Sequence, residues 1–209
     1  FQHLPYLNAY AGKAELFAAC KVHYEPLGVY YGKAVPGTPL SEGKTFAICN
    51  DSSNAARAFS LLAQKGVIDK EAEGENYPVN AAGDGLTSGT ASRWVSKNGV
   101  TVTLVAENLL AAARTDYDFA CLPCSTALTG NVSAEDRAAA EDDPAQISEK
   151  ANVIAARAED YKNNAAYRAK IDALTEVMLS EVVAAYFKTA YRGVIVCNAQ
   201  TQIDLRGAL

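Results

Sequence analysis

The sequence predicts an α/β protein with mainly parallel sheets. Short runs of apolar, strand-forming residues alternate along the chain with longer stretches in which apolar residues recur at helical spacing. That alternation is typical of strands joined by helical crossovers. The chain has 209 residues, of which 49% are hydrophobic and 21% charged. It is therefore long enough for one large or two small globular domains, and its composition does not indicate disorder.

The clearest element is a strand followed directly by a helix, between Lys44 and Gly66. Thr45 to Cys49 is a short run of strand formers, which predicts a buried strand. The apolar residues after it repeat at i, i+3, i+4 and i+7, the spacing of one buried helix face, and they are Ala55, Ala58, Phe59 and Leu62. Asp51 lies where the helix N-cap is expected.

This helix N-terminus predicts an anion site. The N–H groups of the first turn, on Ser52, Ser53 and Asn54, would be unpaired and would point toward the end of the strand. Arg57 lies in the second turn, and helical side chains lean toward the N-terminus. Its guanidinium can therefore reach the same place and hold a carboxylate by two hydrogen bonds. The alternative is an arginine on a solvated helix face.

The other elements are taken in chain order. Pro5 begins a helix, and residues 21–31 form an extended segment that Pro26 and Gly28 mark as an edge or kinked strand, not a central one. The stretch 71–89 is polar and Gly-rich, as a surface excursion would be. The elements expected after it are a strand at 100–105, a helix at 108–114, a strand at 118–122, an acidic loop with a helical turn at 131–150, a strand at 151–157, helices at 167–178 and 180–191 with Ser180 as N-cap, a stop at Gly193 and a strand at 194–197.

Composition excludes several kinds of partner. The net charge of −5 and the absence of basic clusters argue against nucleic acid. No apolar run approaches the roughly 20 residues that cross a bilayer. The five cysteines are odd in number and lie mostly in apolar runs, which indicates buried thiols. With only two histidines and one C-x-x-C pair, we expect no metal site and no cofactor.

Several blocks resemble the NlpA lipoproteins, the methionine-binding receptors of bacterial ABC importers. They occur in that family's order and span nearly the whole chain: FQHLPYL at 1–7, KVHYEPLGVY at 21–30, NDSSNAAR at 50–57, DYDFA at 116–120, ANVIAAR at 151–157 and YFKTAYRGVIV at 186–196. The resemblance implies a two-lobed, type II-like periplasmic-binding-protein fold. Lobe 1 would comprise 1–30 and 151–209, lobe 2 would comprise 31–150, and the ligand would lie in the cleft between them.

The resemblance also implies site residues. An arginine at the position of Arg57 would hold the ligand carboxylate, and Asn152 would supply an amide contact. Ser125 stands where the family has a second contacting asparagine. Phe1, His3 and Tyr6 would form the wall around a methionine side chain, since sulfur–aromatic contacts are favourable. Further candidates are Tyr30, from its place on a crossing between lobes, and Asn50, at the start of the NDSSNAAR block.

The function implied is that of an extracytoplasmic receptor, not an enzyme, with no catalytic residues. It would bind L-methionine or a related amino acid and deliver it to the membrane subunits of an ABC importer. It would be located in the cell envelope, held at the membrane through a lipid anchor that this chain does not contain.

Two other functions remain open. Cys121 and Cys124 form a C-x-P-C pair like that of a thiol–disulfide oxidoreductase, but Cys121 continues an apolar strand and no basic residue lies nearby in sequence. The other alternative is a binding protein that has lost its ligand, which Ser125 would allow.

The family has further strand–helix units ahead of the FQH block, so we expect the first lobe to be incomplete. Its apolar helix positions, among them Ile171, Leu174, Met178 and Val182, then need a cover. An N-terminal segment of the natural protein, carrying the export signal and part of the ligand wall, would provide it. The alternative is a second copy of the chain.

Overall fold

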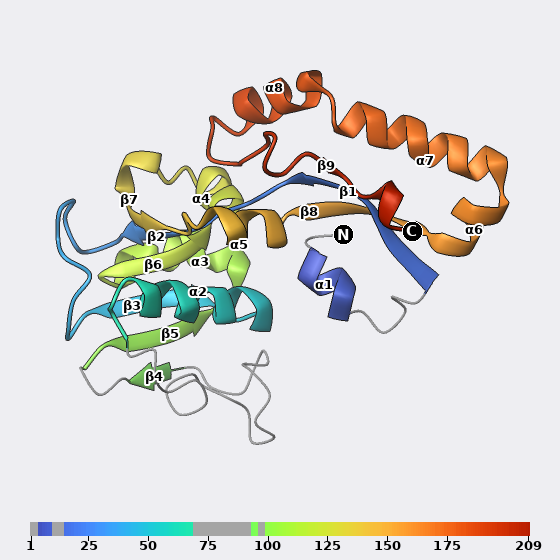
Figure 1. Ribbon diagram of the computed structural model, residues 1–209. Helices are drawn as coiled ribbons and strands as arrows, with labels where there is room; N and C mark the ends of the chain where they lie inside the picture. The colour runs from blue at the N-terminus through green and yellow to red at the C-terminus, as the bar shows by residue number, and fades with distance from the viewer. Residues whose placement is uncertain (1–3, 10–14, 69–92, 96–98) are drawn as a thin grey trace. The chain divides into compact units, whose positions relative to one another are not determined.

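The computed structural model describes residues 4–9, 15–68, 93–95 and 99–209. Their contacts divide the chain into two compact units (Figure 1). Unit 1 comprises Phe1–Pro26 and Asp142–Leu209, and unit 2 comprises Leu27–Glu141. Both junctions fall somewhat earlier in the chain than the boundaries predicted from the sequence at 30/31 and 150/151.

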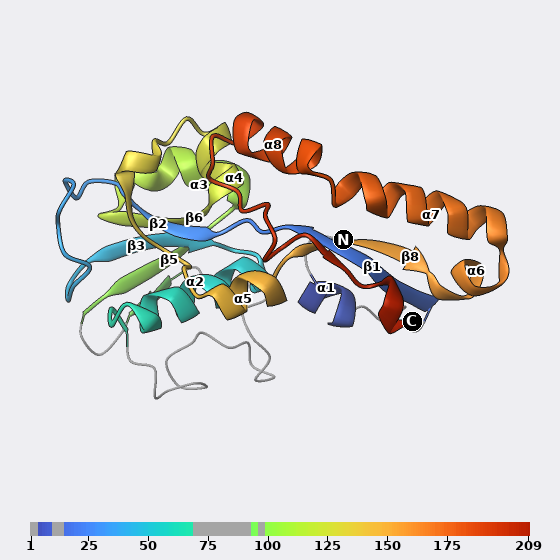
Figure 2. The same ribbon diagram turned by 45° about the horizontal axis from the view of Figure 1, so that its top comes forward.

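Unit 2 is an α/β unit. Its elements in chain order are β2 (Leu27–Tyr31), β3 (Thr45–Cys49), α2 (Ser52–Gln64), β4 (Arg93–Val95), β5 (Thr101–Val105), α3 (Glu107–Ala113), η2 (Arg114–Asp116), β6 (Phe119–Pro123), α4 (Cys124–Thr129), η3 (Ala134–Asp136) and β7 (Arg137–Ala140). The strands form one six-stranded sheet in the order β4-β5-β3-β6-β2-β7. Figure 2 shows α2 on one side of this sheet and α3 and α4 on the other.

The predicted α/β class is confirmed. β3 pairs in parallel with both β5 and β6, while β4, β2 and β7 join the sheet through antiparallel pairs. Parallel neighbours need a crossover connection, and α2 and α3 follow β3 and β5 as expected. The carboxyl ends of β3 and β6 therefore lie at the same edge of the sheet. Each of these ends is followed closely by a helix, α2 after β3 and α4 after β6.

Two predictions for unit 2 were wrong. Residues 27–31 were expected to form an edge or kinked strand, but β2 lies between β6 and β7 and is paired on both sides. Pro26 lies just outside β2, so it removes no donor from the ladder. The acidic stretch 131–150 was expected to be a loop with a helical turn. The helical part is present, as η3 and a short helix at Pro144–Glu149, but the stretch also contains the strand β7. The sequence of β7 is Arg-Ala-Ala-Ala, which lacks strong strand formers, so pairing with β2 decides its conformation.

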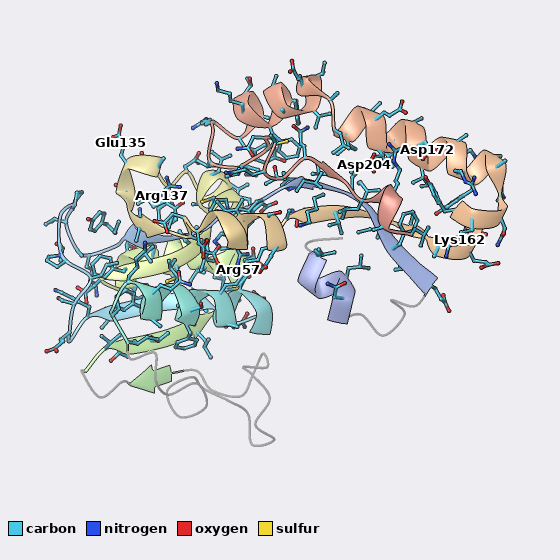
Figure 3. The ribbon with its side chains drawn as sticks, viewed as in Figure 1. Arg57, Glu135, Arg137, Lys162, Asp172 and Asp204 are labelled. Carbon is cyan, nitrogen blue, oxygen red and sulfur yellow. The ribbon has the colours of Figure 1, made fainter. Side chains whose placement is uncertain are left out.

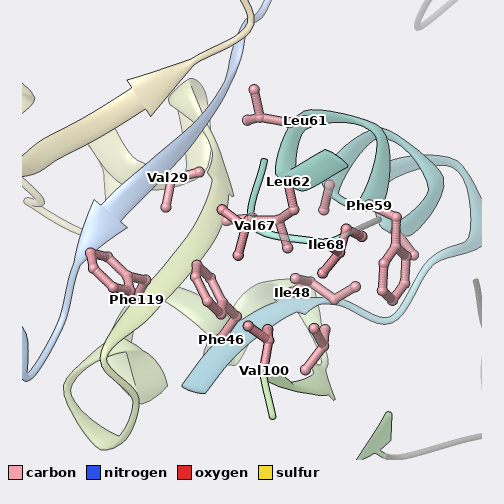
Figure 4. Close-up of a cluster of buried hydrophobic side chains, with 14 of the residues drawn as sticks. Val29, Phe46, Ile48, Phe59, Leu61, Leu62, Val67, Ile68, Val100 and Phe119 are labelled. Carbon is pink, nitrogen blue, oxygen red and sulfur yellow. The ribbon is translucent and has the colours of Figure 1, made fainter. Parts of the chain in front are cut away.

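The core of unit 2 lies between α2 and the sheet (Figure 4). The helix presents the apolar face that its spacing predicts, including Ala55, Ala58, Phe59 and Leu62, all at most 1% exposed. Against it the rings of Phe46 and Phe119 stack with centroids 5.1 Å apart. Burying a large apolar side chain stabilises a fold by about 1.5–3 kcal/mol, so this cluster holds β3 and α2 in place beneath the candidate site.

Unit 1 is built on a small antiparallel sheet. Its elements are α1 (Leu4–Ala9), β1 (Leu16–His23), α5 (Pro144–Glu149), β8 (Asn152–Arg157), α6 (Ala158–Asn163), α7 (Ala165–Met178), α8 (Glu181–Ala190), β9 (Ile203–Asp204) and η4 (Arg206–Ala208). The strand order is β8-β1-β9. Asp172 on α7 and Asp204 on β9 are labelled in Figure 3, and Arg206 binds both, at 2.9 Å and 2.6 Å.

The helices of unit 1 agree with the sequence better than its last strand does. Ser180 caps α8 by accepting a hydrogen bond from the backbone N–H of Val183. Gly193 ends the segment with a φ of 73°, which favours glycine. The prediction of a strand at 194–197 was wrong. Val196 makes an isolated bridge to Tyr24, and β1 pairs with β8 on one side and with β9 on the other. The helix α6 was not predicted.

Part of the apolar surface of α7 and α8 is exposed. Val182 is 78% and Leu174 is 41% exposed, whereas Ile171 and Met178 are partly buried. Within the described ranges, no helix combines the length and apolar character that a membrane-spanning helix requires.

Candidate functional site

The candidate site of unit 2 begins where β3 ends and α2 starts. Asp51 has extended backbone angles and its Oδ1 accepts a hydrogen bond from the N–H of Asn54 at 2.8 Å, which confirms it as the N-cap. Its Oδ2 accepts a hydrogen bond from the Cys49 thiol at 2.7 Å. The expectation that the N–H of Asn54 would be unpaired was therefore wrong, because the cap residue itself satisfies that donor.

Arg57 projects from the second turn of α2 and is labelled in Figure 3. Its Nε donates to Oε1 of Glu141 at 3.2 Å, and its Nη2 donates to Oε2 of the same carboxylate at 2.5 Å. Its Nη1 donates to Oδ1 of Asn54 at 3.2 Å. The guanidinium thus holds a carboxylate by two hydrogen bonds, the geometry expected from the sequence, but this carboxylate belongs to the protein.

This ion pair lies inside the protein. The side chain of Arg57 is 13% exposed and that of Glu141 is 3% exposed. A solvated arginine on a helix surface, the alternative considered from the sequence, is thereby excluded. Glu141 was missed because it lies in the stretch interpreted as an acidic loop. Buried acidic residues are rare unless paired, and the sequence did not mark Glu141 as buried, because the strand β7 that precedes it was not predicted either.

Tyr30 and Ser125 lie on neighbouring elements of unit 2. The hydroxyl of Tyr30 donates to the Sγ of Cys124 at 3.4 Å, and Nη1 of Arg137 lies 3.8 Å from that sulfur. Burial raises the pKa of Tyr30 well above its usual range. Tyr30 is 1% exposed and packs in the core between the sheet and the helices α3 and α4. Ser125 follows Cys124 in α4 and is partly buried.

Asn50 lies directly after β3, partly buried, and its N–H donates to the carbonyl of Val105 at 3.0 Å. Asn50, Arg57 and Ser125 are therefore all placed by the carboxyl ends of β3 and β6, either in the turn after the strand or on the following helix. Open α/β sheets place their ligands at this edge.

Asn152 belongs to unit 1, at the start of β8. Its side-chain amide lies 2.7 Å from Nε2 of His23, the residue opposite it on β1, and donates to Oε1 of Glu25 at 3.4 Å. The His23 ring packs on Phe187 of α8, with centroids 4.5 Å apart. Asn152 is thus oriented by an imidazole and a carboxylate, neither of which was predicted from the sequence.

The structure does not describe the side chains of the three residues at the N-terminus that were predicted to surround the ligand side chain. Phe1 and His3 lie outside the described residues, and Tyr6 belongs to α1 without a described side chain. Their roles stay predictions.

A cavity of about 430 Å³ lies within unit 1, between α8 and the segment that follows it. It is lined by Ala184, Ala185, Lys188, Gly193, Ile195, Val196, Cys197 and Asn198. Among the predicted ligand contacts whose side chains the structure describes, none lines this cavity.

The cysteines are all free thiols. Cys121 is fully buried in β6; burial raises the pKa of its thiol, and the charge of Glu141 raises it further. Burial likewise raises the pKa of Cys124. A redox-active cysteine needs an accessible thiol with a lowered pKa. The geometry therefore argues against the oxidoreductase alternative.

Cys49, Asp51 and Glu107 bring three potential metal-ligand atoms within 4.8 Å of one another in the described part of the chain. Burial and the hydrogen bond to Asp51 raise the pKa of Cys49 to about 12. With this pKa the thiol keeps its proton at neutral pH and donates it to Asp51. A cysteine that binds a metal must instead lose its proton.

We expect Cys121 and Cys124 not to react with a thiol reagent in the native protein at neutral pH, since only the thiolate is nucleophilic. Mass spectrometry after brief labelling measures this. Cys197, which is only partly buried, is the internal control and should be labelled first. Rapid native labelling of Cys121, or measurable reduction of insulin by the protein, would contradict this prediction.

Known proteins resemble this chain over most of its length. The membrane lipoprotein TpN32 of Treponema pallidum is 29% identical over 196 residues, covering 92% of this chain and 66% of that protein. The chain therefore spans slightly less than two thirds of this curated relative. A lipoprotein from Ruminococcus gnavus has a structure that matches with a TM-score of 0.69 and 26% identity, over 95% of this chain and 77% of that one.

A third relative is a nutrient-binding protein from Burkholderia cenocepacia, whose structure contains bound methionine. It matches with a TM-score of 0.65 and 25% identity, again over 95% of this chain and 77% of that one. Such proteins bind substrates and are not enzymes. The profile described as NlpA lipoprotein matches residues 1–198. Together with the fold and the blocks of sequence that carry the resemblance, this match shows that the chain belongs to the NlpA lipoprotein family.

Proposed function

We propose that this protein is a solute-binding receptor of an ABC importer and that it binds methionine or a related amino acid. The observation that carries the proposal is the membership in the NlpA lipoprotein family, together with the relative whose structure contains methionine. The position of Arg57 supports it from within the chain, because the helix that carries it begins at the carboxyl end of β3, the edge where open α/β sheets place their ligands.

In this proposal Arg57 binds the carboxylate of the amino acid. Asn50, Ser125 and Asn152 supply polar contacts, while Phe1, His3, Tyr6 and Tyr30 surround the side chain. An asparagine amide offers two N–H donors and a carbonyl acceptor, whereas a serine hydroxyl offers one donor, accepts at the same oxygen and lies on a shorter side chain. Ser125 therefore offers a ligand different polar contacts from those of an asparagine. The identity of the ligand is for this reason determined by the binding experiment described below.

The family also suggests where the protein acts. TpN32 is named a membrane lipoprotein, which supports a location outside the cytoplasm with a lipid anchor at the membrane. The partners proposed are the membrane subunits of the importer. No nucleic acid is expected, given the net charge of −5.

A thermal-shift panel of amino acids tests the proposal. A ligand that binds only the native state stabilises it by RT ln(1 + [L]/Kd), about 2.7 kcal/mol at a hundredfold excess over Kd. We expect L-methionine or a close analogue to raise the Tm, and amino acids with charged side chains to leave it unchanged. If another solute raises the Tm and methionine does not, the methionine assignment fails while the receptor function stands.

A second candidate is a family member that has lost its ligand. The occupation of the Arg57 fork by Glu141 favours it, as does the serine at position 125. The same panel decides: no shift with any amino acid, together with no heat of binding in calorimetry, would support this candidate.

A further inference from the structure

Glu141 is held in place from two sides. Its Oε2 accepts a hydrogen bond from the backbone N–H of Leu27 at 2.9 Å, and its own N–H donates to the carbonyl of Leu27 at 2.9 Å. Leu27 and Glu141 are the first and last residues of unit 2. The carboxylate that binds Arg57 is therefore fastened to backbone at the place where the chain enters and leaves this unit.

Burial decides what happens to this pair when a ligand binds. The Glu141 side chain is 3% exposed, and a buried charge that loses its partner is strongly destabilising. A ligand carboxylate that displaced Glu141 would gain one ion pair and break another. Such an exchange would leave a buried charge without its guanidinium, so it is disfavoured compared with binding that keeps the pair.

The geometry also shows how Glu141 fixes the guanidinium of Arg57. Glu141 takes the Nε–Nη2 edge of the guanidinium, and Asn54 accepts from Nη1. The group is planar, so contacts at three of its nitrogens fix both its position and its plane. A ligand carboxylate that left this pair intact would therefore meet the guanidinium at a place other than the Nε–Nη2 edge.

We propose that Glu141 is a positioning residue: it holds the Arg57 guanidinium in the orientation that binds the ligand carboxylate, and it stays paired with Arg57 in the complex. This inference rests on the proposed function, because it assigns how that same site is organised. Fixing a charged fork before binding lowers the entropy that must be lost when the ligand arrives.

The test follows the Arg57 Nε–H resonance in ¹H–¹⁵N spectra of the labelled protein, assigned by its loss in Arg57→Lys. We expect a slowly exchanging signal in the wild type that persists at saturating L-methionine. In Glu141→Gln one carboxylate oxygen is replaced by an NH₂ group, which cannot accept the hydrogen bonds that Arg57 and Leu27 donate. The Arg57 signal should therefore exchange quickly in this variant. By calorimetry, the same variant should bind L-methionine about tenfold or more weakly.

Asp118→Asn is the matched control. Asp118 is also a carboxylate of unit 2 that accepts from a backbone N–H, that of Thr45, at 2.8 Å. Its replacement should lower the Tm while leaving both the Arg57 signal and the affinity for L-methionine unchanged. A purely structural role for Glu141 predicts that the two variants behave alike.

Two results would overturn the inference: loss of the Arg57 signal when L-methionine binds, which makes Glu141 a competitor, or unchanged affinity in Glu141→Gln. The wild-type spectra need no variant, so the first result is decisive even if Glu141→Gln fails to fold. A wild type that binds no amino acid overturns the proposed function instead. In that case a slowly exchanging Arg57 signal would still support the claim that Glu141 fixes the guanidinium of Arg57. The absence of this signal would overturn that claim as well.

Discussion

Arg57→Ala is expected to lower the free energy of unfolding by about 3–5 kcal/mol, in addition to abolishing ligand binding. The reason is Glu141, whose side chain is 3% exposed and would lose the guanidinium that neutralises it. From the sequence alone the same change would be expected to affect binding far more than stability, since alanine is a good helix former. Urea denaturation followed by far-UV circular dichroism measures the loss.

Arg157→Ala is the control for this prediction. Arg157 also forms an ion pair, with Asp160, but its side chain is 65% exposed. Surface pairs contribute little, so the change should stay within about 1 kcal/mol. Arg57→Lys should recover part of the stability but little of the binding, because an ammonium cannot replace the fork. A loss below about 1 kcal/mol in Arg57→Ala would show that Glu141 reaches solvent easily, against the buried pair described above.

Phe46→Ala is expected to destabilise the protein by about 3–5 kcal/mol. Phe46 is 0% exposed in β3, the strand that leads to the candidate site, and its ring stacks on Phe119. Removing it leaves a cavity between the sheet and α2 that the surrounding side chains fill only in part. The denaturation midpoint should fall while the m-value stays constant.

Val35→Ala is the matched control, because Val35 is an apolar residue of the same unit that is 69% exposed. A surface change of this kind is usually within about 0.5 kcal/mol. Equal midpoints for Phe46→Ala and the wild type would contradict the core assigned to unit 2.

The sequence was sufficient for features that depend on neighbouring residues. The strand Thr45–Cys49, the N-cap Asp51 and the apolar face of α2 all follow from local propensity and periodicity. The same is true of Ser180 as the cap of α8. It also indicated Arg57, because the distance from the second turn of a helix to its N-terminus is set by helix geometry. The roles of the predicted site residues stay predictions.

The tertiary structure decided which carboxylate Arg57 binds. Glu141 lies 84 residues away along the chain, and it reaches Arg57 only because the weak strand former β7 pairs with β2 and brings Glu141 beside Leu27. The interior position of β2 and the short strand β9 were decided in the same way. Strand pairing and buried ion pairs join residues that are distant in sequence, and their stability depends on burial, which no local pattern of residues expresses. Local patterns therefore determined the helix and its arginine, and long-range packing determined the charge that holds that arginine.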